Sequence, residues 1–299
     1  MAKRKEKKYR PISLISVVIT AILVIIYALN GSPTFERLKE AKNDDYPMTV
    51  TFIDVGQGDC SLIECGDTVI LIDGGESEYA GTVNSYLALK GISEIDCYIF
   101  THPHSDHIGA VPGIMRVNDV NGVMMTTFSE INIPTTNTYE KLLDAVLEED
   151  CDVLYVSAGD TYTFGELTLD ILSPSAQTDE YNDMSVVVKV TYEDTSFLFT
   201  GDATQTVEKE MLSKFDLSAD VLKVGHHGSY TSTSEEFLSA VSPLLAVISC
   251  GEDNSYGHPH KDVTDLLDSH GISVSRTDKQ GNIVVYSNGK NIYVNGTEE

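Results

Sequence analysis

Three histidines and one aspartate stand within a single nine-residue stretch, and this cluster constrains the fold of the chain more than any other feature. The stretch, residues 101–109, reads Thr-His-Pro-His-Ser-Asp-His-Ile-Gly. The cluster comprises His102, His104, Asp106 and His107. The apolar, β-rich segment 95–100 precedes it, and residues 108–117 carry apolar side chains at helical spacing. The sequence therefore predicts a strand, a turn and a helix, with the four side chains converging at the turn.

This combination of side chains is typical of a metal site. Neutral imidazoles and a carboxylate are common ligands of Zn²⁺ and of other divalent first-row metals. The chain has eight histidines in 299 residues, and three of them stand in this one stretch. A histidine-rich polar loop without a metal is the alternative, but it does not explain this concentration. The cluster therefore indicates a divalent metal site.

The N-terminus differs in composition from the rest of the chain. Six basic residues within positions 1–11 precede the uncharged run 12–29, which includes only three polar side chains. Eighteen helical residues rise about 27 Å, enough to cross the hydrocarbon core of a membrane. Basic residues on the near side favour a cytoplasmic tail, so the sequence predicts a single-pass signal anchor with the remainder outside the cytoplasm. A cleaved signal peptide is the alternative, but the run is long for one and lacks a good cleavage site.

Beyond the anchor, residues 30–46 predict a polar linker, and residues 47–299 suffice for one large α/β domain. Removing residues 1–30 from the formal charge of −26 leaves 14 basic and 45 acidic side chains, a charge of −31. Such an acidic domain is not suited to grip a polyanion nonspecifically. The five cysteines are scattered and form no CxxC pair, so we expect buried thiols and no disulfide framework.

Strand and helix signals alternate along this domain. Predicted strands cover residues 48–55, 60–65, 68–73, 95–100, 120–125, 153–156, 167–172, 185–192, 196–200, 219–224, 245–249, 272–276, 282–286 and 291–294. Predicted helices cover residues 79–90, 108–117, 139–149, 207–215, 234–241 and 262–270. Strands followed by helices, with polar residues at the strand ends, predict a layered α/β fold whose site lies along one sheet edge.

Polar residues at three other strand ends are candidates to join the cluster. Asp73 precedes two glycines after one strand, Asp202 follows Gly201 after another, and a His226-His227 pair follows a third. Glycines at such turns permit close backbone approach to a site.

Three residues further along the chain are candidates to protonate a leaving group or to clamp a phosphate. They are Lys223, His258 and His260. For His258 and His260 the alternative is an exposed turn that contains Pro259.

These motifs resemble a known family. The 102–107 cluster, with Asp73 upstream and Asp202 downstream, resembles the metallo-β-lactamase superfamily, an αββα sandwich of metal-dependent hydrolases. Three further motifs read Phe-Ile-Asp-Val-Gly-Gln-Gly-Asp, Lys-Val-Gly-His-His-Gly-Ser and Tyr-Gly-His-Pro-His. They resemble more narrowly the hydrolase domain of ComEC-type competence proteins and the phosphorylcholine esterases of teichoic acid. The resemblance covers about residues 48–286.

The resemblance implies two divalent metal ions, Zn²⁺ or Mn²⁺. The expected ligands are His102 and His104 for one ion, Asp106 and His107 for the other, and Asp202 between the two. His226 is the expected last ligand. His227 is its rival for that role and is otherwise expected to face the substrate cleft or to pack beneath the next loop. Asp73 is expected to orient an imidazole from behind.

One position departs from the family pattern. Superfamily members usually supply another histidine between the first cluster and the bridging aspartate, but none stands between His107 and His226. Asn182 and Asp183 stand where that ligand is expected, and Asp183 is the expected replacement. A ligand set richer in oxygen favours harder ions, so Mn²⁺ competes with Zn²⁺.

Together these features predict a membrane-anchored, extracytoplasmic hydrolase of phosphoester or phosphodiester bonds. Two cations about 3.5–4 Å apart would lower the pKa of a shared water and polarise the ester. The expected catalytic residues are Asp106, His227 and His258. A ComEC-like nuclease acting on extracellular DNA is one alternative, although the charge of −31 disfavours nucleic acid as a partner. A non-catalytic surface binding module is the other.

Overall fold

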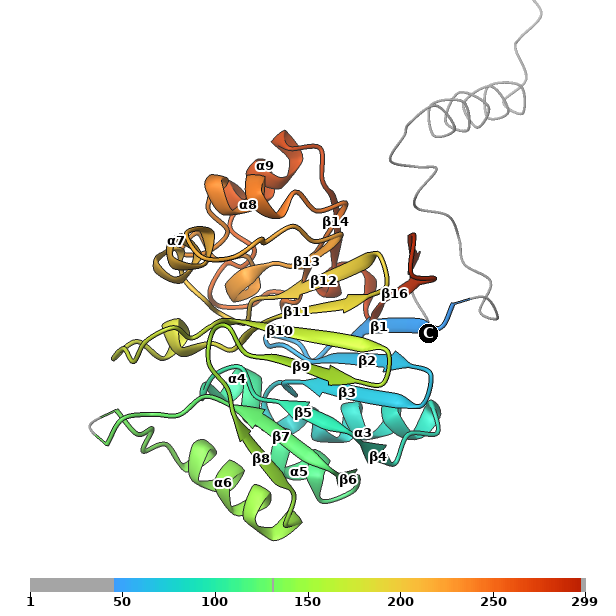
Figure 1. The fold of residues 1–299 in the computed structure, drawn as a ribbon, viewed down its shortest axis with the longest axis vertical. Coiled ribbons are helices and arrows are strands. Elements are labelled where there is room, and N and C mark those ends of the chain that lie inside the picture. The colour runs from blue at the N-terminus through green and yellow to red at the C-terminus, as the bar shows by residue number, and fades with distance from the viewer. Residues whose placement is uncertain (1–45, 131, 297–299) are drawn as a thin grey trace, which may run out of the picture. The chain divides into compact units, whose positions relative to one another are not determined.

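The computed structural model describes residues 46–130 and 132–296, and most of its strands form two sheets that face each other (Figure 1). In spatial order, the first sheet comprises β17 (Ile292–Gly296), β16 (Ile283–Ser287), β1 (Met48–Phe52), β2 (Ser61–Cys65), β3 (Thr68–Ile72), β5 (Cys97–Ile99), β7 (Gly122–Met125) and β8 (Asp152–Tyr155). The second comprises β15 (Ser273–Arg276), β14 (Leu245–Ile248), β13 (Val221–Lys223), β12 (Thr195–Phe199), β11 (Val187–Tyr192), β10 (Leu167–Ser173) and β9 (Thr161–Phe164). A short pair, β4 (Glu94–Ile95) and β6 (Asp119–Val120), stands apart.

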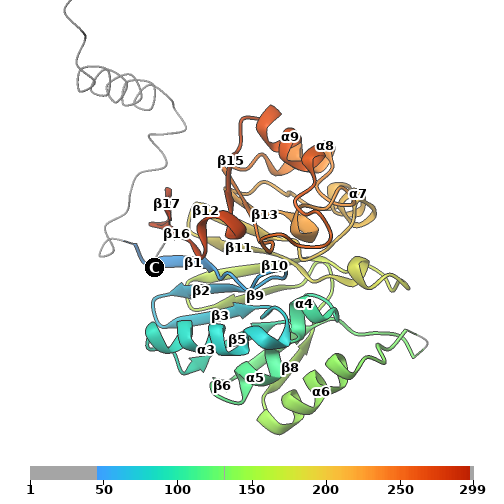
Figure 2. The same cartoon turned by 180° about the vertical axis from the view of Figure 1, so that it is seen from behind.

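Helices cover the outer face of each sheet (Figures 1 and 2). The first sheet is covered by α3 (Ala80–Leu89), α4 (Ser105–Ile108), α5 (Val111–Met115) and α6 (Asn137–Glu149). The second is covered by α7 (Gln205–Leu212), α8 (Glu235–Val241) and α9 (Lys261–Ser269). Shorter helices are η2 (Ser77–Tyr79), η3 (Tyr181–Met184), η4 (Gly225–Gly228) and α10 (Thr277–Gln280). The layers confirm the predicted αββα sandwich.

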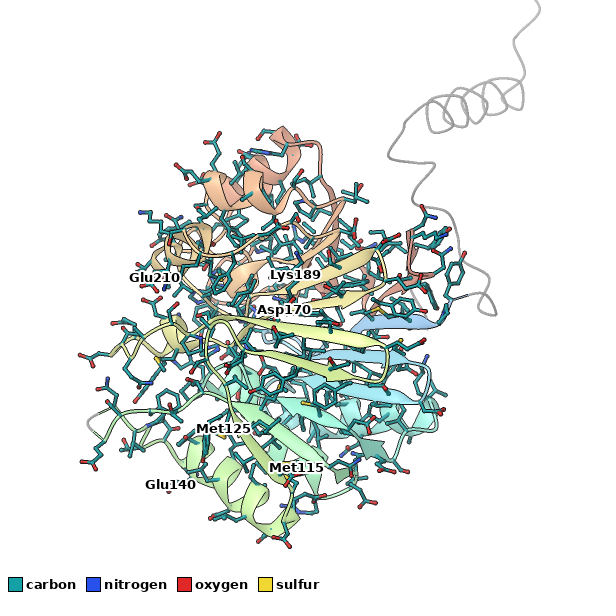
Figure 3. All side chains as sticks on the ribbon, viewed as in Figure 1. Met115, Met125, Glu140, Asp170, Lys189 and Glu210 are labelled. Carbon is teal, nitrogen blue, oxygen red and sulfur yellow. The ribbon has the colours of Figure 1, made fainter. Side chains whose placement is uncertain are left out.

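Apolar side chains fill the space between the layers. Between the sheets, the rings of Phe52 and Phe199 stack with centroids 5.9 Å apart. On β10, buried Leu169 alternates with the more exposed Asp170, which lies opposite Lys189 of β11 (Figure 3). This period of two is what a strand with one buried face requires. All five cysteines are free and four are buried, as expected.

The structure changes some predicted boundaries. The expected helix 108–117 is divided into α4 and α5, and Pro112 lies in the first turn of α5, where a missing N–H costs no helical hydrogen bond. Strand β9 was not predicted. Within residues 46–130 and 132–296, no helix is long and apolar enough to cross a membrane. The predicted tail 1–11 and anchor 12–29 lie outside the described residues.

Candidate metal centre

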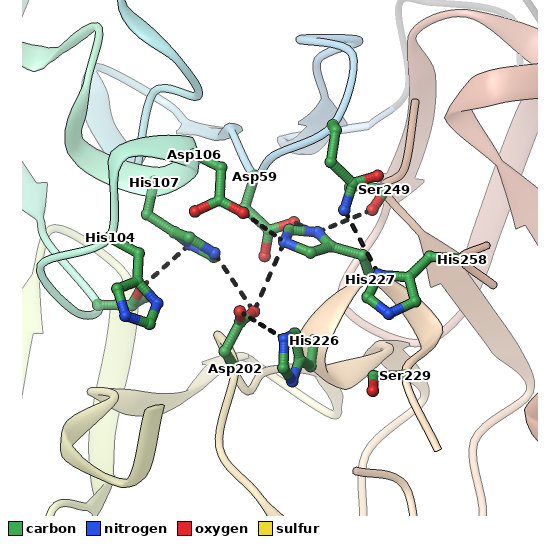
Figure 4. Close-up of polar contacts among 12 residues, drawn as sticks. Asp59, His104, Asp106, His107, Asp202, His226, His227, Ser229, Ser249 and His258 are labelled. Carbon is green, nitrogen blue, oxygen red and sulfur yellow. Dashed lines mark hydrogen bonds and ion pairs between the residues drawn. The ribbon is translucent and has the colours of Figure 1, made fainter. Parts of the chain in front are cut away.

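The carboxyl ends of neighbouring parallel strands bring most of the predicted site residues to one edge of the sandwich (Figure 4). Asp73 follows β3, and the 102–107 cluster follows β5, its parallel neighbour. Asp202 follows β12 in the second sheet, and the His226-His227 pair follows β13. The two sheets therefore contribute opposite walls of one site.

The first ligand group consists of His102, His104 and Asp202. One ligand atom from each lies within 4.8 Å of the others. His102 Nε2 is 3.0 Å from His104 Nδ1 and 3.7 Å from Asp202 Oδ2. Two imidazole nitrogens and a carboxylate oxygen thus face a common point.

The second group consists of Asp106, His107, Asp202 and His227. Asp202 Oδ1 is 3.3 Å from His107 Nε2 and 3.7 Å from His227 Nε2. His227 Nε2 is also 3.3 Å from Asp106 Oδ2. Asp202 therefore directs Oδ1 to this group and Oδ2 to the first, which is the arrangement a bridging carboxylate requires.

Hydrogen bonds from behind orient two of the imidazoles. Asp73 Oδ2 accepts from His107 Nδ1 at 2.7 Å and from Thr101 Oγ1 at 2.7 Å, while Oδ1 accepts from Thr101 N at 2.9 Å. His227 Nδ1 donates to the Ser249 carbonyl at 3.0 Å. In both rings Nε2 is left to face the ligand groups. Asp73 therefore takes the position predicted for it.

The donor set fits a divalent cation. His107 Nε2 and Asp202 Oδ1 are buried and have no hydrogen-bond partner among the described residues. Burial opposes charge on Asp202, but the imidazoles of His107 and His227 outweigh it and hold the pKa of Asp202 well below its usual range. Burial also opposes charge on His107, but Asp202, Asp73 and Asp106 raise its pKa well above the ordinary value. A positive charge at this point would satisfy the unpaired atoms and the surrounding carboxylates.

The histidine pair does not follow the predicted order. His226 and His227 both have left-handed backbone conformations, with φ of 50° and 54°. His227 is buried and belongs to the second ligand group. His226 is partly exposed, with Nε2 3.5 Å from Asp202 Oδ2 and Nδ1 3.1 Å from Thr231 Oγ1. The geometry favours His227 as the ligand and places His226 in the open cleft, the reverse of our expectation.

Asp183 is not brought to either ligand group. It lies in η3, and its Oδ1 accepts a hydrogen bond from Thr204 Oγ1 at 2.5 Å. This contact turns the carboxylate toward the start of α7. The structure therefore speaks against the predicted metal-binding role of Asp183.

The three candidates for phosphate or leaving-group contact have different surroundings. Lys223 is only 2% exposed and its Nζ lies 2.9 Å from Asp59 Oδ1, so it does not reach the cleft. His260 precedes α9, and its Nδ1 accepts from Tyr230 N at 3.2 Å. His258 lines the cleft, where burial and the nearby imidazoles of His227 and His226 lower its pKa to about 4. Of the three, only His258 takes a place that suits the predicted contact.

A cleft of about 320 Å³ opens above the ligand groups. It is lined by Gln57, His104, Ser105, Asp106, Asp202, His226, His227, Tyr256 and His258. No lysine or arginine is among these lining residues. The cleft is therefore polar and open, and its lining contains imidazole side chains but no lysine or arginine.

Thr101 and Asp59 also contribute to the site and were not predicted. Thr101 holds Asp73 through its backbone N–H and its hydroxyl. Asp59 lies between Lys223 and His227. Asp59 closes the Gly56–Asp59 loop after β1, and its place after Gly58, a residue that allows close backbone approach, was the available signal.

Comparison with known proteins now decides the family. Residues 53–252 match the metallo-beta-lactamase superfamily. The chain belongs to this superfamily. Its members are generally metal-dependent hydrolases, in agreement with the ligand groups described above.

Three of the sequence relatives are ComEC-type competence proteins. The chain is 34% identical over 254 residues to ComE operon protein 3 of Bacillus subtilis, an alignment that covers 78% of this chain and 32% of the relative. It is 32% identical over 242 residues to Recombination protein 2 of Haemophilus influenzae, covering 79% of this chain and 28% of that protein. The chain thus spans about a third of the length of these relatives.

Solved structures confirm the fold. The metallo-beta-lactamase fold protein YhfI from Bacillus subtilis aligns with a TM-score of 0.57 at 15% identity, covering 80% of this chain and 98% of YhfI. CmlA, a diiron beta-hydroxylase from Streptomyces venezuelae, aligns with a TM-score of 0.56 at 16% identity, covering 81% of this chain and 54% of CmlA. Because one of these is a hydroxylase, the shared fold alone does not define the reaction.

Proposed function

We propose that this chain hydrolyses phosphoester or phosphodiester bonds with two divalent cations, Zn²⁺ or Mn²⁺. The observation that carries the proposal is Asp202, whose two oxygens face two ligand groups beneath an open polar cleft. Two-cation sites of this kind recur in phosphatases and nucleases, where they generate hydroxide from water at neutral pH and stabilise phosphoryl oxygens. Members of the superfamily are generally metal-dependent hydrolases, which supports hydrolysis as the reaction class.

Each residue of the site would have a distinct role in holding the two cations. His102, His104 and Asp202 would hold one cation, and Asp106, His107, Asp202 and His227 the other. Asp73 and the Ser249 carbonyl would keep two of the imidazoles oriented. No protein nucleophile is required, so the remaining side chains of the cleft are free to bind substrate.

His226 and His258 are proposed to contact the substrate. Both line the cleft, and their ring centroids are 5.6 Å apart. Gln57 Nε2 lies 3.5 Å from His258 Nδ1, a position that suits donation to this ring nitrogen. His258 Nε2–H would then donate to a phosphoryl or leaving-group oxygen. A neutral imidazole with a pKa of about 4 suits this contact better than proton transfer to the leaving group.

Cleavage of extracellular DNA is the second candidate. Two relatives are named for competence and recombination, Competence protein ComA of Neisseria gonorrhoeae and Recombination protein 2 of Haemophilus influenzae, and this favours DNA. The charge of −31 beyond residue 30 and the absence of lysine and arginine from the cleft lining disfavour a long polyanion. We therefore place small phosphodiesters first.

A substrate panel tests the proposal. The 299-residue chain in detergent would be assayed with Mn²⁺ and with Zn²⁺ on bis-nitrophenyl phosphate, phosphorylcholine esters, single-stranded and double-stranded DNA, and a β-lactam. We expect the chain to turn over the phosphodiester, and we expect this turnover to be lost in the Asp202→Ala variant. Turnover of the lactam alone would contradict the proposal. Stoichiometric metal binding without any turnover would instead indicate a binding module.

We further propose that residues 12–29 anchor the chain and that the hydrolase domain lies outside the cytoplasm. The support is the 18-residue uncharged run and the six basic residues before it. Protease added to intact cells is expected to remove the domain, while a cytoplasmic marker stays protected. A domain that resists protease until the cells are lysed would exclude this topology.

A further inference from the structure

A buried lysine–aspartate pair lies directly behind the second ligand group. Lys223 ends β13, and Asp59 lies in the loop that joins β1 to β2. The two side chains come from different sheets, are 2% and 5% exposed, and approach to 2.9 Å between Nζ and Oδ1. Lysine is almost never fully buried unless it is paired, so this ion pair requires an explanation.

Asp59 contacts two of the proposed ligands at once. Its Oδ1 is 3.2 Å from His227 Nδ1, the nitrogen that also donates to Ser249. Its backbone N–H donates to the Asp106 carbonyl at 3.1 Å, at the start of α4. A side chain on Gly58 would lie 2.3 Å from that same carbonyl, so the loop and the helix are in close contact. Any shift of Asp59 would therefore move both His227 and Asp106.

Lys223 holds Asp59 in this place. Its Nζ donates to the Val224 carbonyl at 2.9 Å and pairs with Asp59 Oδ1. Three residues beyond Lys223, the chain turns into the His226-His227 pair. The ammonium group therefore connects the end of β13, which carries His227, to the loop that supports Asp106.

We propose that Lys223 and Asp59 are positioning residues for the second cation site. Asp59 orients the His227 ring and the first turn of α4, and Lys223 fixes Asp59. The first ligand group, with His102 and His104, makes no such contact with the pair and does not depend on it. The proposal concerns metal binding, so it stands or falls independently of the substrate.

Metal titration of three variants of the 299-residue chain tests this role. The variants are Lys223→Met, Asp59→Asn and the double variant that combines them. Co²⁺ would be the probe, with its absorption spectrum and the two binding constants as readouts, and thermal unfolding would be recorded in parallel. We expect the cation held by the second ligand group to lose about 10–100-fold in affinity, while the cation held by the first group changes little. The double variant should regain melting temperature, because no unpaired charge remains buried, but not metal affinity.

Lys90→Met is the matched control. Lys90 pairs with Glu64 at 3.2 Å, with both side chains about one quarter exposed, and the variant removes the same single charge. It should leave both binding constants unchanged. Equal weakening of both sites in every variant would overturn the proposal. The proposal would also be overturned if the double variant regained both its melting temperature and its metal affinity. The pair would then affect only the stability of the fold.

Discussion

Replacing Asp202 by alanine is expected to remove both cations and essentially all activity. Its two oxygens face the two ligand groups, at 3.7 Å from His102 Nε2 and 3.3 Å from His107 Nε2. Loss of an outer partner of a metal ligand already costs about 10–100-fold, so loss of a shared ligand should cost more than about 100-fold at each site. Metal content per chain and turnover of bis-nitrophenyl phosphate would measure the two effects.

Asp183→Ala is the control for this experiment. Asp183 is also an aspartate near the site, but its carboxylate accepts from Thr204 and lies outside both ligand groups. This variant should keep two cations per chain. If the Asp202 variant retained both ions, the bridging role would be excluded. If instead Asp183→Ala lost one ion, the ligand set predicted from the sequence would be right and the geometric assignment wrong.

The two neighbouring histidines should separate into a ligand and a substrate contact. His227→Ala is expected to lower metal content, because its Nε2 faces Asp106 and Asp202 from a buried position. His226→Ala is expected to keep both cations and to lower turnover. A higher substrate concentration should not restore the turnover of the His227 variant. A better leaving group should partly relieve the His226 variant if that ring assists departure.

The measurement is metal stoichiometry together with rates on nitrophenyl and alkyl phosphodiesters. Each histidine variant serves as the control of the other, since both remove an imidazole from the same turn. Metal lost in His226→Ala and kept in His227→Ala would restore the assignment made from the sequence. Metal lost in both would mean that His226 completes the first group, where its Nε2 already lies 3.5 Å from Asp202.

The sequence predicted most of the strands, the layered α/β fold and the convergence of most of the candidate residues because these depend on local patterns. His102, His104, Asp106 and His107 stand within six residues, so a single turn brings them together. Asp73 and Asp202 follow strands, and parallel strands end at the same sheet edge. Short spacing along the chain and position at the end of a strand can both be read from the sequence alone.

The positions of the His226 and His227 rings could not be predicted, for a conformational reason. Neighbouring residues of a strand point to opposite faces until a turn begins, which predicts different surroundings for the two rings. Both residues adopt left-handed conformations, which residues other than glycine rarely do, so both rings reach the site. Backbone strain of this kind is typical of functional sites, but it has no signature in side-chain pattern.

The contacts of Lys223, Asp59 and Asp183 depend on tertiary structure. Lys223 and Asp59 are 164 positions apart in the chain and come from different sheets. Asp183 was placed by analogy with a family position, and its actual partner, Thr204, became a neighbour only through the packing of η3 against the start of α7. Neither contact follows from local spacing.

Because the proposed ligands come from two different sheets, metal binding affects how long the protein stays folded. Asp106 and His107 follow the first sheet, and Asp202 and His227 follow the second, so the complete donor set exists only while the two layers are held together. Cations that bind the folded state alone stabilise it by mass action, by about 2.7 kcal/mol at a free concentration one hundred times the dissociation constant. The supply of divalent metal would then govern how long the folded chain survives, as well as how fast it works.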